Sequence, residues 1–374
     1  MNTQSYRSEF PITDRYCFLN HAAVSPLSRR VVRAVKELSE DMATQGIAGY
    51  PKWQARIEEV RALFSELIGA RATDVAFITN TSEGISAIAS GFPWRAGDKV
   101  ITVQPDFPSN IYPWLNLERL GVKVITVKRR NGRFSVDEVR KATEPGVKIL
   151  AVSSVDFSTG HYCDLKGLGD FCRQKGIVFC VDAIQSLGLI PMDVKRFNID
   201  VLAAGGQKWL LGPMGCGGLF VSERIRNLVH PQVVGWKSVV DEQDFFKIQF
   251  ELKKDAARFE PGTLNIFGIY ALGAAMELLR EVGIEDIYRR VLDLTDQFID
   301  GLKKRGLRVT TPLEPNERSG IVCFEPQSDP KDLFTYFLSH GVMVSERNGK
   351  IRISPHFYND SEDVERFFGV LDLF

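Results

Sequence analysis

The stretch Ile177-Val-Phe-Cys-Val-Asp-Ala-Ile-Gln-Ser186 begins as a short apolar run rich in β-branched residues and turns polar at Asp182. Similar short runs recur at 75–79, 99–103, 122–127, 149–153 and 201–203, and segments with helical character separate them. Strands that alternate with helices are typical of βαβ units, which build a mostly parallel sheet with helices on both faces. The sequence therefore predicts an α/β fold.

The parts of the chain before and after this alternation have different patterns of predicted secondary structure. Two amphipathic helices are expected at 29–44 and 51–67, before the first strand. After about residue 240 the pattern predicts helices at 266–282 and 284–305, short strands at 308–310, 320–324 and 349–354, and a closing helix from 361. We therefore predict an N-terminal arm at 1–15, a large domain at 16–245 and a smaller C-terminal α+β domain at 246–374.

Composition narrows the class of protein. The 374 residues carry 47 basic and 47 acidic side chains, which argues against a broad nucleic-acid-binding or membrane-binding surface. The six cysteines form no CxxC pair and have no histidine at metal-ligand spacing, so no metal site is predicted and the thiols are expected to be reduced. With no apolar leader and no membrane-length run, the sequence predicts a soluble, cytoplasmic protein.

One charged residue stands out from its surroundings. Lys208 lies in the glycine-rich, apolar run Ala203-Ala-Gly-Gly-Gln-Lys-Trp-Leu-Leu-Gly-Pro-Met-Gly-Cys-Gly-Gly-Leu-Phe220. An ammonium group away from water costs several kcal/mol unless it is paired or neutralised. Asp182 follows the preceding strand, and the carboxyl ends of parallel strands meet at one edge of a sheet. We therefore expect Asp182 and Lys208 to lie close together.

A third feature belongs to the same edge. Thr81 and Ser82 follow the strand at 75–79 and begin a helix, where hydroxyl groups and free amides suit a phosphate. Taken singly, these residues and Asp182 could be ordinary helix caps. Together with Lys208 they match the needs of pyridoxal phosphate: the lysine forms a Schiff base, the carboxylate keeps the ring nitrogen protonated, and the helix holds the phosphate.

With these residues identified, the chain resembles the class V aminotransferase family of fold-type I pyridoxal phosphate enzymes. The resemblance covers nearly the whole chain in order, through residues 16–23, 80–83, 106–110, 181–185, 206–208, 258–265 and 350–354. Within the family it points to the branch of cysteine desulfurases and isopenicillin N epimerase-like proteins. It implies a small amino-acid substrate and a homodimer with shared active sites.

The resemblance also implies individual roles. It makes Lys208 and Asp182 catalytic, Phe107 the group that stacks on the cofactor ring, and Gln185 a hydrogen-bond partner of its phenolic oxygen. The other implied residues are Thr81, Ser82, Gln207 and Thr263 for the cofactor, with Thr263 reaching the partner subunit's phosphate, and Arg352, Asn20 and His21 for the substrate.

Four positions depart from the family's pattern. Gln207 and Gly205 stand where members often carry histidine and serine, so the phosphate must be anchored differently in detail. Phe107 replaces the stacking histidine of desulfurases, and Phe157 stands where many members have asparagine. Phenylalanine can stack on the ring but cannot carry a proton. These choices favour the epimerase-like side of the family.

The reaction itself stays open at this point. We expect an aminotransferase, with an epimerase or a pyridoxal-phosphate-dependent lyase as the enzyme alternatives and a sensor built on the same scaffold as the non-enzyme alternative. A persulfide-forming cysteine desulfurase is disfavoured, because the loop at 344–351 before Arg352 has no cysteine and Cys323 lies too far back.

Overall fold

The computed structural model describes residues 3–374 and has a seven-stranded sheet at its centre. Along the sheet the strands run β2 (Val75–Ile78), β8 (Gly217–Val221), β7 (Val201–Gly205), β6 (Val178–Asp182), β5 (Val147–Ser153), β3 (Lys99–Gln104) and β4 (Lys123–Lys128). Strand β8 is antiparallel to both of its neighbours, and every other pair is parallel. The predicted α/β class is confirmed.

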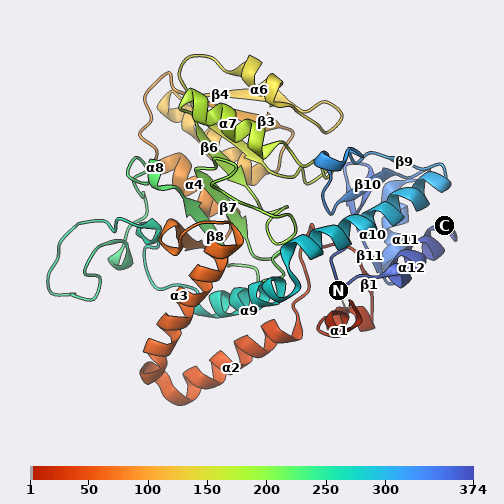
Figure 1. Ribbon diagram of the computed structural model, residues 1–374, viewed down its shortest axis with the longest axis horizontal. Helices are drawn as coiled ribbons and strands as arrows, with labels where there is room; N and C mark the ends of the chain where they lie inside the picture. Colours follow the sequence, from red (N-terminus) through yellow and green to blue (C-terminus); the bar gives the residue numbers. More distant parts are fainter. Residues whose placement is uncertain (1–2) are drawn as a thin grey trace.

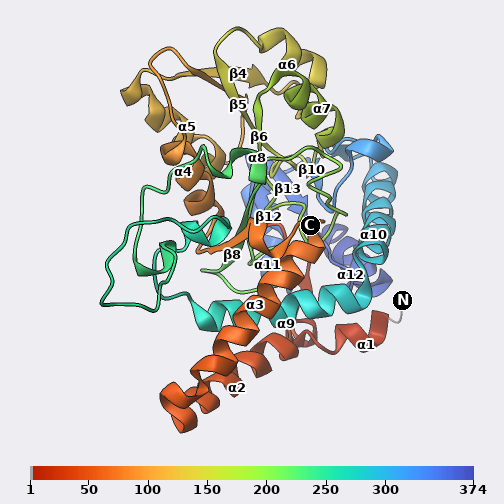
Figure 2. The same cartoon turned by 60° about the vertical axis from the view of Figure 1, so that its left-hand side comes forward.

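Both faces of this sheet are buried, which explains the continuous apolar runs. In β6, Phe179 and Val181 belong to one core cluster, whereas Val178 and Cys180 belong to another on the opposite face. The first face packs on α3 (Tyr50–Leu67), α6 (Val136–Ala142), α7 (Leu165–Lys175) and α9 (Ile266–Val282). The second packs on α4 (Thr81–Gly91), α5 (Tyr112–Leu115) and α8 (Glu223–Arg226). Figures 1 and 2 show α3 and α9 beside α2 (Arg29–Gln45).

A second, smaller sheet lies toward the C-terminal end of the chain. Its order is β12 (Ser345–Arg347), β13 (Lys350–Ile353), β10 (Val322–Glu325) and β9 (Arg308–Val309), all antiparallel. It shares a core with α10 (Ile284–Lys304), α11 (Pro330–Ser339) and α12 (Ser361–Leu371). The division at residue 245 stays a prediction; α9, which comes after it, packs in the core of the large sheet.

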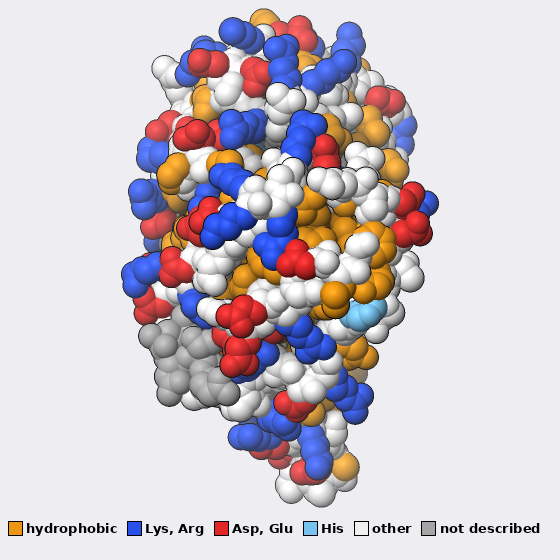
Figure 3. Space-filling view, turned by 90° about the vertical axis from the view of Figure 1, so that its right-hand side faces the viewer, with side chains coloured by type: hydrophobic (Ala, Val, Ile, Leu, Met, Phe, Trp, Pro, Cys, Tyr) orange, Lys and Arg blue, Asp and Glu red, His pale blue; other side chains and the backbone are white. Residues whose placement is uncertain are grey.

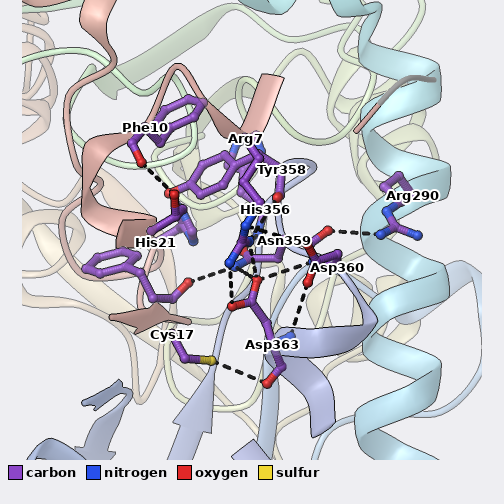
Figure 4. Close-up of polar contacts among 12 residues, drawn as sticks. Arg7, Phe10, Cys17, His21, Arg290, His356, Tyr358, Asn359, Asp360 and Asp363 are labelled. Atoms are coloured by element: carbon purple, nitrogen blue, oxygen red, sulfur yellow. Dashed lines mark hydrogen bonds and ion pairs between the residues drawn. The ribbon is translucent and has the colours of Figure 1, made fainter. Parts of the chain in front are cut away.

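The N-terminal segment is held against the C-terminal elements. Strand β1 (Cys17–Phe18) pairs with β11 (Val342–Met343), and α1 (Thr3–Arg7) lies near α12 (Figure 1). Arg7 binds Asp363 through two hydrogen bonds of 2.6 and 3.1 Å, and Asn359 donates to the same carboxylate at 2.8 Å (Figure 4). Residues 1 and 2 of the predicted arm lie outside the described residues.

The surface has no strongly charged face in the view toward the C-terminal elements. Figure 3 shows basic and acidic side chains interspersed there, in keeping with equal totals of the two. Within residues 3–374, no helix combines the length and the apolar character that crossing a membrane requires.

Candidate active site

Asp182, Gly205 and the start of α4 lie at the carboxyl-terminal edge of the large sheet. Asp182 is the last residue of β6, and Gly205 is the last residue of β7, the neighbouring strand. The N–H of Gly205 donates to the hydroxyl of Thr81 at 3.0 Å, which ties the start of α4 to the end of β7. Crossing helices bring these strand ends together although the residues are far apart in sequence.

Lys208 is buried in a position where its charge is not directly neutralised. The side chain is 9% exposed, and its ammonium makes no hydrogen bond or ion pair with any described residue. Its Nζ lies 5.4 Å from the centre of the Phe107 ring. Burial lowers the pKa of Lys208 to about 8; the negative charge of Asp182 opposes this shift, and the positive charges of Arg352 and Arg347 add to it.

The backbone around Lys208 is fixed by a residue that sequence reasoning missed. Ser25 donates its hydroxyl to the carbonyl of Lys208 at 2.6 Å, and its N–H donates to the carbonyl of Gln207 at 2.8 Å. Nothing in the sequence around Ser25 points to this contact, which joins residues separated by 183 positions. The two Ser25 hydrogen bonds therefore hold the backbone from which the Lys208 side chain extends.

Asp182 is a buried carboxyl group with only one of its oxygens bonded to protein. It is 2% exposed, and Oδ1 accepts the N–H of Ile184 at 2.9 Å. Burial raises the pKa of Asp182 to about 7; the Ile184 bond and the Lys208 charge lower it, and the nearby Asp106 carboxylate raises it further. The other oxygen is therefore free to pair with a cationic group of a ligand.

The start of α4 has the features of a phosphate site. Asn80 caps the helix by accepting the N–H of Glu83 at 2.9 Å. The N–H groups of Thr81 and Ser82, in the same first turn, have no intrahelical partners. Ser82 donates its hydroxyl to Ser109 at 2.7 Å. A Cβ atom placed on Gly205 would lie 2.4 Å from Oε1 of Gln207, so a side chain at position 205 would require the end of the Gln207 side chain to move.

Arg352 supplies a buried cation at the other side of the site. It is 1% exposed on β13, Nη1 donates to the carbonyl of Phe157 at 2.8 Å, and Nη2 donates to the hydroxyl of Ser345 at 3.2 Å. Its Nε has no partner, and no carboxylate within residues 3–374 forms an ion pair with it. Burial lowers the pKa of Arg352 to about 10. Asn20 contacts this arginine through Ser345, whose hydroxyl it accepts at 2.6 Å.

Two predicted side chains are already engaged by the protein. His21 is fully buried, its Nδ1 lies 2.8 Å from the carbonyl of Ser354, and its Nε2 lies 2.7 Å from the hydroxyl of Tyr358. A carbonyl can only accept, so Nδ1 carries the proton and Nε2 accepts from tyrosine. Gln185 donates to the Ala22 carbonyl at 3.0 Å and accepts the indole N–H of Trp209 at 2.9 Å.

The remaining predicted positions differ in exposure. Phe107 is partly exposed, and its ring lies 5.4 Å from that of Phe157 in an edge-to-face arrangement. Thr263 is exposed in this single chain, so its predicted role toward a partner subunit stays a prediction. Sequence reasoning also missed Trp209 and Arg347. The local signal for Trp209 is that it directly follows Lys208. The local signal for Arg347 is its place two residues after Ser345, on the strand that pairs with the strand of Arg352.

Comparison with known proteins identifies the family. The family model "Aminotransferase class-V" matches residues 17–367, and the chain therefore belongs to the class V aminotransferase family. A probable cysteine desulfurase of Methanothermobacter thermautotrophicus is 28% identical over 98% of this chain and 96% of its own length. An uncharacterised aminotransferase of Bacillus subtilis is 27% identical over 96% of this chain and 95% of its own length.

A solved structure agrees with the fold. The apo structure of a cysteine desulfurase from Thermococcus onnurineus superposes with a TM-score of 0.91 at 27% identity, covering 99% of this chain and 97% of that one. The relatives thus carry names of two different activities. They show a pyridoxal-phosphate-dependent family without assigning one of its reactions to this chain.

Pyridoxal 5′-phosphate is the cofactor of this family, and the residues present fit it. Lys208 offers an amine that is neutral in part at physiological pH, Asp182 has a free carboxyl oxygen, and the start of α4 offers unbonded amides. These three groups suit an aldehyde, a ring nitrogen and a phosphate, respectively.

Proposed function

We propose that this protein is a pyridoxal-phosphate-dependent aminotransferase that acts at the α-carbon of an amino acid. The observation that supports this most is Arg352, a buried guanidinium with an unpartnered Nε and no acidic partner among residues 3–374. A buried cation without an anion is costly, and a planar fork suits a carboxylate. Arg352 would therefore bind the α-carboxylate of the substrate and orient its α-carbon toward Lys208.

Lys208 is the group that we assign to proton transfer. With its pKa at about 8, roughly a quarter of the side chain is the neutral amine at pH 7.5. The neutral Nζ takes a proton from the substrate α-carbon as a general base and returns one as the ammonium form. The bound cofactor supplies a carbonyl that condenses with amines and a ring that takes up an electron pair.

Epimerisation by two bases needs a second proton donor on the side of the substrate α-carbon opposite Lys208. Transamination needs only one group that removes and returns a proton, and the site favours this reaction. The ring of Phe107 has no proton to donate. His21 has both ring nitrogens bonded, and so has His356, which lies 3.2 Å from the Trp209 carbonyl and accepts the Phe357 N–H at 2.9 Å. Lys208 alone is therefore assigned both the removal and the return of the proton.

Cleavage of a carbon–sulfur bond is the second candidate, because similar proteins are named cysteine desulfurases. The cysteines limit how such a reaction could proceed. All six are buried free thiols, and burial raises the pKa of Cys323 to about 12. The hairpin of β12 and β13 contains no cysteine. Any such activity is therefore expected to proceed without a persulfide on the protein.

We further propose a homodimer. The loop between α8 and α9 exposes Phe245, Phe246, Ile248 and Phe250, with Phe246 fully exposed. A run of large apolar side chains in water is typical of a protein interface. Thr263 lies in the same connection between helices, so a second copy seated there would bring it toward a shared site.

The test is the visible absorption spectrum of the holoenzyme with a panel of amino acids. Conversion to the pyridoxamine form, with release of a stoichiometric keto acid, is expected for an aminotransferase. Release of sulfide from cysteine without such conversion would instead favour the second candidate. Lys208→Ala should abolish conversion while the protein stays folded by circular dichroism. If amino acids change the absorption spectrum of the wild-type holoenzyme but none of them is converted, transamination is refuted.

A further inference from the structure

The site contains a second arginine that the proposed reaction has not used. Arg347 ends β12, and the two-residue turn Asn348-Gly349 connects it to β13. Both turn residues have positive φ, 51° and 77°, as the Asn-Gly turn of a tight hairpin requires. This turn fixes the pairing of Arg347 with Lys350 and of Ser345 with Arg352.

The register puts both arginines on one face of the hairpin. Residues paired across two strands share a face, and so do residues two apart along a strand. Arg347 therefore lies on the face that carries Ser345 and Arg352. The hydroxyl of Ser345 bonds to Arg352 and to Asn20, which shows that this face is the one turned toward the site. Diagonal neighbours on such a face start about 7–8 Å apart, within reach of long side chains.

Arg347 is half-buried and has no acidic partner. Its Nη1 donates to the backbone carbonyl of Glu346 at 2.7 Å, and no carboxylate within the described residues forms an ion pair with it. The Glu346 carboxylate accepts the Gly349 N–H at 2.8 Å instead. The charge of Arg347 nevertheless acts on the site, because it lowers the pKa of both Lys208 and Arg352.

The acidic groups near the site leave the hairpin arginines unpaired. The free oxygen of Asp182 is assigned to the cofactor ring, Asp106 accepts hydrogen bonds from Ser153 at 2.8 Å and from Asn110 at 3.2 Å, and Asp156 forms an ion pair with Arg129 at 3.2 Å. The hairpin side of the site therefore carries two guanidinium groups and the Lys350 ammonium, and no carboxylate within residues 3–374 forms an ion pair with either guanidinium group. One α-carboxylate satisfies only one of them.

We propose that Arg347 binds a second carboxylate of the substrate, so that the substrate class is amino acids with a carboxylate side chain. This inference rests on the proposed function, in that it takes Arg352 as the α-carboxylate site. Arg347 is then a specificity-determining residue: it selects dicarboxylic over neutral amino acids through a charge-assisted, bidentate contact.

The experiment compares holoenzyme dissociation constants, read from the cofactor absorbance, for glutamate, aspartate and alanine. In the wild type we expect the acidic amino acids to bind about 10- to 100-fold more tightly than alanine, the range of one charge-assisted contact. Arg347→Gln should remove most of that preference, and Arg347→Lys should retain part of it. The matched control Arg33→Gln, which removes an exposed arginine of α2 far along the chain from the hairpin, should leave the preference unchanged.

A wild type that binds alanine as tightly as glutamate would overturn the inference, and so would an Arg347→Gln variant that keeps the full preference. Circular dichroism and the cofactor absorbance establish that each variant is folded and loaded. The test of Arg347 and the test of transamination can fail independently of each other. Preferential binding of glutamate without conversion refutes transamination alone, whereas conversion of neutral amino acids without any preference refutes the role of Arg347 alone.

Discussion

Replacing Lys208 by methionine should stabilise the apo protein at neutral pH, although it removes the residue to which we assign catalysis. The ammonium is buried without a direct partner, and its pKa falls from the ordinary 10.5 to about 8. The folded state therefore binds this proton less tightly than the unfolded state does. Methionine has a similar length and no charge, so it fills the same space without the cost of desolvation.

The magnitude and the sign follow from linkage. A pKa lowered from 10.5 to about 8 corresponds to about 3 kcal/mol. Below pH 8 the group is protonated in both states and the full cost is present. Between pH 8 and 10.5 the folded state has lost the proton and the unfolded state has kept it, so the free energy of unfolding rises with pH. Above 10.5 the contribution vanishes. The attraction to Asp182 is already contained in this net shift.

The assay is urea unfolding of the apo protein at several pH values from 7 to 10.5, for the wild type and for Lys208→Met. Because other groups titrate in this range, the difference between the two proteins is the quantity of interest. It should be largest near pH 7.5, at up to about 3 kcal/mol, and shrink toward pH 10.5. Lys36→Met, at an exposed position on α2, is the control. A variant that is less stable than the wild type at pH 7.5, or a difference that does not change with pH, would refute the reasoning.

Four further predictions concern other parts of the molecule. Arg352→Lys should weaken amino-acid binding about 10- to 100-fold in absorbance titrations, because lysine cannot replace a bidentate fork; unchanged affinity would remove Arg352 from the substrate site. Arg7→Met should lower the free energy of unfolding by about 1–3 kcal/mol, since Asp363, 3% exposed, loses its ion-pair partner; an unchanged denaturation midpoint would count against this. The double change Phe246→Asp and Ile248→Asp should convert a dimer to monomer in sedimentation, and a monomeric wild type would contradict the proposed interface. None of the six cysteines should react with a thiol reagent at pH 8 before unfolding, because all are buried; one fast-reacting thiol would restore the possibility of a protein persulfide.

Much of the fold could be predicted because its signals are local. The apolar runs correspond to β2 to β7, and the helices expected at 266–282 and 284–305 were found as Ile266–Val282 and Ile284–Lys304. A strand buried on both faces must be apolar throughout, and a helix end needs a cap, so each element is marked by its own residues. The domain boundary was harder to assign, because the change in secondary-structure pattern near residue 240 does not reveal that α9 packs on the large sheet.

The candidate site also has features that the sequence predicts and features that depend on the tertiary structure. By itself, the sequence indicated the α/β class and the family, and it predicted that Lys208 and Asp182 lie close together, because the carboxyl ends of parallel strands meet at one edge. Only the tertiary structure decided which polar groups are free: both nitrogens of His21 are bonded, while Arg352 reaches the Phe157 carbonyl across 195 positions and keeps an unpartnered Nε. Hydrogen-bond satisfaction depends on every neighbour in space, and sequence patterns of period two or 3.6 describe only neighbours along the chain.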